Sequence, residues 1–148
     1  MMKLGKIVLA MTCVAALSAC DNSKPETMFA AQYSAPQSTL DVAAGSTFAV
    51  PLTVKNTSTA TWDSKAAKDP VVAAYHWLDA DRKLVVQDGD RTLFAEPVKP
   101  GSQVTMQLKV EAPKAAGTYV LQAGLLQEGV VWFEAKNVKP LEISVKVK

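Results

Sequence analysis

Few side chains in this 148-residue sequence could take part in catalysis or metal binding. His76 is the only histidine, and Cys13 and Cys20 are the only cysteines. A structural zinc site uses four nitrogen and sulfur ligands, and His76 lacks partners for such a set. The sequence has no G-x-S-x-G, H-E-x-x-H or phosphate-loop pattern. We therefore expect a protein that is not an enzyme, without catalytic residues, metal or cofactor, in which His76 is a surface or hydrogen-bonded histidine.

Aspartates surround one predicted hairpin, at Asp79, Asp81, Asp88 and Asp90. Their carboxylates could in principle bind Ca²⁺, but the spacing differs from that of an EF-hand and no glutamate follows at the closing position. Aspartate is also a common turn residue, because its side chain accepts hydrogen bonds from nearby backbone amides. We expect these four residues to form turns.

The N-terminus has the composition of a secretory signal peptide. Lys3 and Lys6 precede the apolar run Ile7–Leu17, which is interrupted only by Thr12. This run is shorter than the roughly 20 residues that a membrane-spanning helix needs. The sequence therefore predicts a peptide that is removed after export.

The residues Leu17-Ser18-Ala19-Cys20-Asp21 resemble the lipobox of bacterial lipoproteins. The resemblance implies a signal peptide at 1–19, cleavage before Cys20, and a covalent lipid on Cys20 that anchors the protein to a membrane. Two or more acyl chains make such an anchor stable. An aspartate at the position of Asp21 resembles the enterobacterial signal for retention at the inner membrane. We expect a location on the periplasmic side of the inner membrane, with the outer membrane as the alternative.

Loss of the signal peptide changes the chemistry of the mature chain. Cys13 is removed, which leaves no thiol pair for a disulfide although the periplasm would permit one. Without Lys3 and Lys6, the 16 basic residues fall to 14, equal to the 14 acidic residues. The neutral domain has no basic patch of the kind that binds nucleic acid. Residues 20–27 contain a polar, aperiodic tether that reaches about 25 Å at most.

The remaining residues, 28–148, alternate between apolar and polar side chains in the way that half-buried strands do. Four long strands are predicted at 47–55, 104–110, 119–125 and 141–148, and shorter ones at Val71–Leu78, Lys83–Gln87, Arg91–Ala95 and Val130–Phe133. Turn residues separate these stretches. The only helical signal is one turn at Lys65–Lys68. The pattern predicts a single all-β domain, an antiparallel sandwich or barrel.

Segments of this region resemble the immunoglobulin-like domains appended to bacterial glycosyltransferases and glycoside hydrolases, and the four-tryptophan domain of selective-autophagy receptors. They are Asn56–Trp62, Tyr75–Asp79, Gly117–Leu121 and Gln127–Phe133, in a chain with three tryptophans. The resemblance implies an immunoglobulin-like β-sandwich of about 7–9 strands with an accessory or binding role. In such a fold Trp77 is the core tryptophan, and Tyr119 forms a tyrosine corner that ties its hydroxyl to nearby backbone.

The opposite face of the Trp77 strand is a candidate binding face. If Trp77 points inward, an unusually apolar outer face carries Val72, Ala74, His76, Leu78, Val120, Gln122, Gly124 and Leu126. Such a face is either covered by loops of the chain or binds something. A mid-strand glycine such as Gly124 often marks a close approach. One ring of the adjacent Trp132 and Phe133 must face away from the core, and an exposed ring beside His76 and Gln122 would make a small platform.

These residues predict a binding role in the cell envelope. The first hypothesis is a non-catalytic protein-interaction or scaffold module that uses His76, Gln122, Gly124 and Trp132. A second is a glycan-binding module for peptidoglycan or an exported polysaccharide, since aromatic rings stack on sugars. A third is an inhibitor of a hydrolase that inserts a loop such as Asp88–Arg91.

Overall fold

The computed structural model of the chain describes residues 27–148. The predicted signal peptide, the lipidation site Cys20, the sorting residue Asp21 and the rest of the tether up to Glu26 lie outside the described residues. The elements are β1 (Ala31–Ser34), β2 (Thr39–Val42), β3 (Thr47–Asn56), β4 (Val71–Asp79), β5 (Leu84–Val86), β6 (Gln103–Glu111), β7 (Gly117–Gln127), β8 (Val131–Trp132), the 3₁₀ helix η1 (Phe133–Lys136) and β9 (Leu141–Val147). From Thr27 to Lys148, no helix is both long and apolar enough to cross a bilayer.

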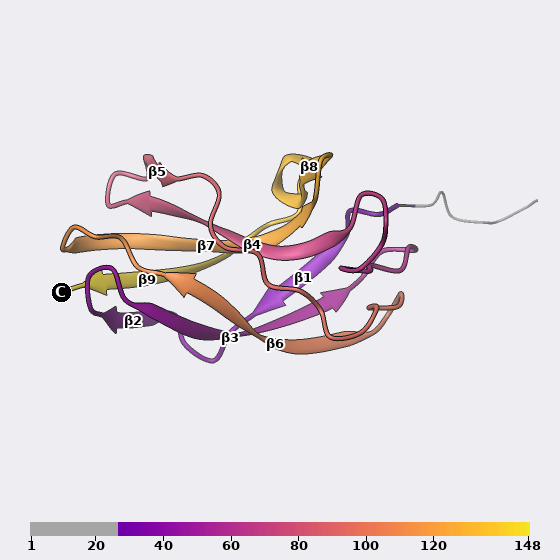
Figure 1. Cartoon of the computed structure of the whole chain (residues 1–148), viewed down its shortest axis with the longest axis horizontal. Helices are drawn as coiled ribbons and strands as arrows, with labels where there is room; N and C mark the ends of the chain where they lie inside the picture. Colours follow the sequence, from indigo (N-terminus) through magenta and orange to yellow (C-terminus); the bar gives the residue numbers. More distant parts are fainter. Residues whose placement is uncertain (1–26) are drawn as a thin grey trace, which may run out of the picture.

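The strands form two sheets that pack face to face, which confirms the predicted immunoglobulin-like sandwich. One sheet has the order β1-β3-β6, and the other has the order β2-β9-β7-β4-β5, with β8 paired to β7. Figure 1 shows β4, β5 and β7 in one layer above β3 and β6, with β8 on the outer side of the upper layer. β2 is parallel to β9, whereas the other pairs are antiparallel. The orders β1-β3-β6 and β9-β7-β4-β5 are those of an immunoglobulin-like fold with a C′ strand.

The core lies between the sheets and follows the predicted alternation. The buried residues of β3, β6 and β9 alternate along each strand, whereas β7 is buried on both faces at 123–126; Leu52, Leu108, Leu121 and Ile143 are fully buried. Trp77 is 1% exposed, as predicted for the core tryptophan. The Tyr119 hydroxyl donates to the Ala115 carbonyl at 3.1 Å, which confirms the tyrosine corner.

Two local predictions were wrong. Arg91–Ala95 is not a strand, because this segment crosses from one sheet to the other: Thr92 bridges to Ala73, and Val98 bridges to Trp62. The buried Phe94 supplied the apolar character that favoured a strand. Near the C-terminus, the strand predicted through Phe133 ends at Trp132 and continues as η1.

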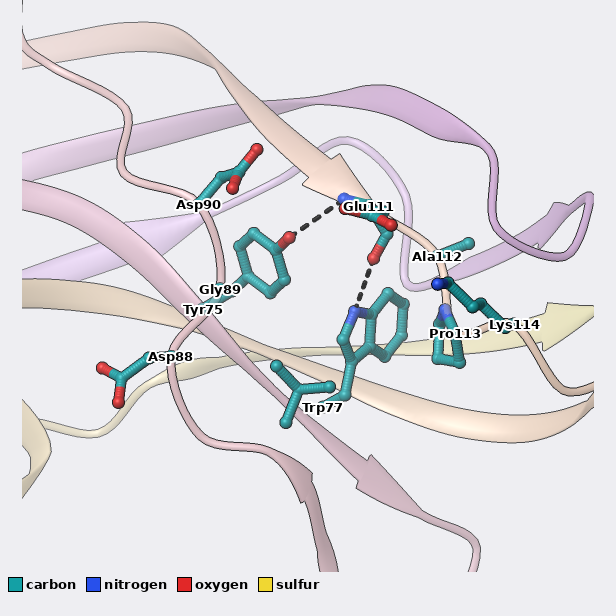
Figure 2. Close-up of a pocket in the computed structure, with 10 residues that line it drawn as sticks. Tyr75, Trp77, Asp88, Gly89, Asp90, Glu111, Ala112, Pro113 and Lys114 are labelled. Carbon is teal, nitrogen blue, oxygen red and sulfur yellow. Dashed lines mark hydrogen bonds between the residues drawn. The ribbon is translucent and has the colours of Figure 1, made fainter.

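No strand lies beyond β6 in its sheet, as far as residues 27–148 show. Side chains from β4 and from the segment that crosses between the sheets cap part of this edge instead. The backbone amide of Lys109 donates to Thr92 Oγ1 at 3.1 Å, and that of Glu111 donates to the Tyr75 hydroxyl at 2.9 Å. Trp77 Nε1 donates to the Glu111 carbonyl at 2.9 Å (Figure 2). The two aromatic side chains therefore tie β4 to the end of β6.

The described chain begins with a fixed residue. The Thr27 amide donates to Thr59 Oγ1 at 2.8 Å, and the Thr59 amide donates to the Thr27 carbonyl at 3.1 Å. Trp62 Nε1 donates to the Met28 carbonyl at 3.0 Å. Thr27 therefore belongs to the fold, one residue earlier than the predicted domain boundary.

Candidate binding surface around Trp132

The apolar outer face of the β4–β7 pair is covered by the chain itself. Most of its residues are nearly inaccessible to solvent: Val72 2%, Ala74 0%, His76 4%, Leu78 8% and Leu126 5%; Val120 and Gln122 are partly buried. Over part of it lie β8 and η1, since β8 pairs with the end of β7 and Glu134 of η1 bonds to His76. Of the two possibilities left open by the sequence, coverage by loops is therefore the one that the structure shows for these residues.

Trp132 and Phe133 point in opposite directions, as their adjacency predicts. Phe133 is 1% exposed and makes edge contacts with Phe29 and Trp62, at ring-centroid distances of 5.1 and 5.5 Å. Trp132 is half-buried on the outer face, with its ring centroid 4.0 Å from that of His76. The ring that faces away from the core is thus Trp132, and it rests on the buried histidine.

His76 has a hydrogen-bond acceptor at each ring nitrogen. Nε2 lies 2.8 Å from Glu134 Oε1, and Nδ1 contacts the backbone carbonyl of Gln87. Burial favours the neutral ring and lowers the pKa of His76, but the hydrogen bond and charge of Glu134, the Gln87 carbonyl and the charge of Asp88 together raise this pKa above its ordinary value of 6.5. His76 is therefore hydrogen-bonded and buried, and it is not a surface residue available to a ligand.

Arg91 lies over the ring of Trp132, with the guanidinium carbon 5.8 Å from the ring centroid. Its Nε donates to Glu128 Oε1 at 2.8 Å, its Nη1 to the Gly89 carbonyl at 2.8 Å and its Nη2 to Asp88 Oδ1 at 3.1 Å. The hydrogen bond to Glu128 is the main reason that the pKa of Arg91 is raised. We call Trp132, Arg91, Glu128 and Glu134 the Trp132 surface.

Gln122 and Gly124 do not contribute as predicted. Gln122 is opposite His76 in the β4–β7 register, but its Nε2 donates to Glu142 Oε1 at 3.1 Å. Arg82 also donates two hydrogen bonds to Glu142, so Gln122 belongs to this neighbouring polar group. A Cβ added to Gly124 would meet nothing closer than 4.0 Å. The close approach expected at Gly124 is therefore absent.

A second surface feature, a pocket of about 300 Å³, lies at the edge of the sandwich between the β4 aromatics and the end of β6 (Figure 2). Tyr75 and Trp77 line it but are only 2% and 1% exposed, so little of either ring is available for stacking on a ligand. The nearby charges are largely paired, with Asp88 on Arg91 and Asp90 on Lys109. The remaining lining is Val86, Gly89, Glu111, Ala112, Pro113 and Lys114.

The aspartates of the hairpin region have the turn and ion-pair roles typical of this residue. Asp79 Oδ1 accepts hydrogen bonds from the amides of Asp81 and Lys83, at 2.9 and 2.8 Å. From Thr27 onward, no three His, Cys, Asp or Glu side chains gather in a way that could hold a metal ion. The loop Asp88–Arg91, predicted as an inhibitory loop, is tied to β4 by the hydrogen bond from the Gly89 amide to the Tyr75 carbonyl, at 2.9 Å.

Sequence reasoning missed Arg91, Glu128 and Glu134 as parts of this surface. Arg91 lies 37 residues from Glu128, and His76 lies 58 residues from Glu134. The only local signal was the Asp88/Arg91 pair, whose spacing of three residues in a turn allows an ion pair.

Comparison with protein-family models gives no match, and no curated protein matches the sequence. Among solved structures, the solution NMR structure of a CARDB domain from Pyrococcus furiosus is similar in fold, with a TM-score of 0.44 and 14% sequence identity. The match covers 79% of this chain and 91% of that domain. Neither the identity nor the fit of the two folds is high enough to carry over a function.

Proposed function

We propose that the protein is a lipid-anchored lipoprotein of the bacterial cell envelope, and that it acts as a non-catalytic protein-interaction module through the Trp132 surface. The lipobox-like residues 17–21 support the anchor. The observation that carries the binding role is Arg91, which is held by three hydrogen bonds above a half-buried Trp132.

Tryptophan and arginine are among the residue types most enriched at the energetic centres of protein interfaces. A side chain that is already fixed loses less conformational freedom on binding, and fixed side chains therefore give more affinity for the same contact area. Ion pairs with Asp88 and Glu128 fix Arg91, and the ring of His76 supports Trp132. The Trp132 surface is thus preorganised in the way that an interface anchor requires.

The same contacts favour a protein over a glycan as the partner. A sugar stacks on a free aromatic face, whereas the Trp132 ring already contacts His76 and lies under Arg91. The resemblance to domains attached to carbohydrate enzymes keeps glycan binding as the alternative. Under this glycan-binding alternative, immobilised peptidoglycan or exported polysaccharide should retain the protein, and Trp132→Ala should abolish the retention.

The proposed anchor restricts where a partner can be. Thr27 is bound to Thr59, so the six residues Asp21–Glu26 are all that separate the fold from Cys20. Six residues span about 20 Å at most. Phe29 contacts Phe133, the neighbour of Trp132, so the Trp132 surface lies near the end where the chain enters the fold. A protein at or in the same membrane is therefore the expected partner.

Crosslinking in living cells followed by mass spectrometry tests the interaction. We expect Trp132→Ala to lower the yield of the main crosslinked partner by about 30-fold, the effect of a hot-spot residue worth about 2 kcal/mol. Leu84→Ala is the matched control, since Leu84 is 53% exposed on β5, and it should leave the yield unchanged. Equal yields from the wild type and Trp132→Ala would refute the assignment.

Lipidation is tested separately by metabolic labelling with a clickable fatty acid. The wild type should carry the label and sediment with membranes, and Cys20→Ala should do neither. A labelled Cys20→Ala variant, or an unlabelled wild type, would contradict the proposed anchor.

A further inference from the structure

We propose that His76 is a protonation latch for the Trp132 surface: its imidazolium form holds β8 and η1 against the outer face of β4, and loss of the proton loosens them. This inference rests on the proposed function of the Trp132 surface and adds a form of regulation to it. The geometry that carries it is the position of His76 between two acceptors on two different segments, Gln87 and Glu134.

A neutral imidazole has one N–H donor and one acceptor nitrogen, whereas the imidazolium has two donors. The Gln87 carbonyl and the Glu134 carboxylate can both only accept, so only the protonated ring satisfies both contacts. If the ring were neutral, the lone pair of one ring nitrogen would face a lone pair of the Gln87 or Glu134 oxygen. His76 is only 4% exposed, so water cannot easily satisfy this contact. Such an unsatisfied buried contact is destabilising, more so when one partner is charged.

The charged groups around His76 come from each segment packed against it. Glu134 faces the ring from η1, and Asp88 lies near it in the loop that follows β5. Trp132 of β8 contacts the ring at an interplanar angle of 43° and lies under Arg91, which Asp88 and Glu128 neutralise. From β7, the neutral Gln122 is opposite His76 and turns toward Glu142. The nearest charges are therefore negative and favour the imidazolium.

The protonation state of His76 affects the Trp132 surface through Glu134 and Trp132, which both contact the imidazole ring. Protonated His76 bonds η1 to β4 through Glu134 and supports Trp132 with a cationic ring. Deprotonation removes one hydrogen bond and the positive charge under the Trp132 ring. Trp132 and Glu134 then lose their common support, and the Trp132 surface loses the fixed geometry that favours binding.

The direction of the pH dependence follows from linkage. In the closed form the pKa of His76 is above 6.5, and in an opened, solvated form it returns to about 6.5. Stabilisation of the closed form is complete below pH 6.5 and is lost as the pH rises through the closed-form pKa. The equilibrium constant for opening of β8 and η1 should therefore increase by up to about tenfold per pH unit between pH 6.5 and the closed-form pKa of His76. Above that pKa it should become constant.

NMR titration of the full chain in detergent micelles measures the pKa directly. His76 is the only histidine, so a protein without a histidine tag gives one unambiguous set of imidazole signals. We expect a pKa above 6.5 in the wild type and a lower value in Glu134→Gln, which keeps the side-chain size but removes the charge. Glu96→Gln is the control, since Glu96 is an exposed carboxylate outside the Trp132 surface, and it should titrate like the wild type.

Amide hydrogen exchange of the same proteins then tests the motion. After correction for intrinsic exchange, opening of residues 130–138 should rise with pH in the wild type, while β3 should show no change. Glu134→Gln should flatten this dependence. A wild-type pKa of 6.5 or less, or exchange of 130–138 that does not follow the titration, would overturn the latch. Neither measurement requires a partner, so either outcome is separable from the crosslinking result.

Discussion

The two glycines Gly89 and Gly124 provide a matched pair of substitutions whose effects should differ in sign. Gly89 packs directly on the ring of Tyr75 beside the pocket (Figure 2). A Cβ added there would lie well inside 3.0 Å of three ring carbons, a separation that real Cβ atoms essentially never show. Gly89→Ala must therefore displace either the loop or the ring.

Each displacement affects one hydrogen bond: movement of the loop weakens the bond between Gly89 and the Tyr75 backbone, and movement of the ring weakens the bond to the Tyr75 hydroxyl. The Gly89 amide donates to the Tyr75 carbonyl at 2.9 Å, and the Tyr75 hydroxyl accepts from the Glu111 amide at 2.9 Å. Overpacking costs about 1–3 kcal/mol and each hydrogen bond contributes about 1 kcal/mol. We expect Gly89→Ala to lower the free energy of unfolding by about 2–4 kcal/mol, or the melting temperature by roughly 8–16 °C for a domain of this size.

Gly124→Ala is the control. The new methyl group meets no atom closer than 4.0 Å, and alanine is favoured over glycine in a strand by about 0.5–1 kcal/mol. Urea unfolding followed by circular dichroism measures both variants. A Gly89→Ala protein as stable as the wild type, or equal losses in the two variants, would refute this account of the glycines.

Other substitutions test the remaining parts of the fold. Tyr119→Phe removes the hydroxyl bonded to Ala115 and should cost about 1 kcal/mol in urea unfolding, without a change in the far-ultraviolet spectrum. Asn56→Ala should cost at least about 3 kcal/mol in the same assay, because the fully buried amide bonds to the backbone of Ser58 and Ala60 in the following loop and to the distant Val98 carbonyl. Arg82→Gln should change the free energy of unfolding by less than about 1 kcal/mol, because its ion pair with Glu142 is exposed; a larger loss would mean that the pair is part of a coupled network.

Local pattern was sufficient to predict the strands of the core. A strand buried on one face needs an apolar side chain at every second residue, and β3, β6, β7 and β9 have them. Trp77 and Tyr119 were predictable because their roles follow from positions within a strand and a corner. The segment 91–95 has similar residue types but crosses between the sheets, and this path depends on the bridges of Thr92 and Val98 to distant residues.

The candidate site was predictable only in part, because most of its contacts join residues that are far apart in the sequence. That Trp132 and Phe133 face opposite ways follows from their adjacency. Which groups surround Trp132 depends on contacts between β4, the loop after β5 and η1, which no local pattern contains. The sequence therefore indicated Trp132 correctly as the outward ring but indicated Gln122 in place of Arg91.

The side chains that cap β6 also bear on aggregation. An edge strand with unpaired backbone amides can recruit a strand from another molecule. The Tyr75 hydroxyl and Thr92 Oγ1 accept hydrogen bonds from the amides of Glu111 and Lys109, at an edge to which residues 27–148 add no further strand. These two oxygens close that part of the edge to intermolecular pairing. Tyr75 and Thr92 thus act against edge-to-edge aggregation at β6.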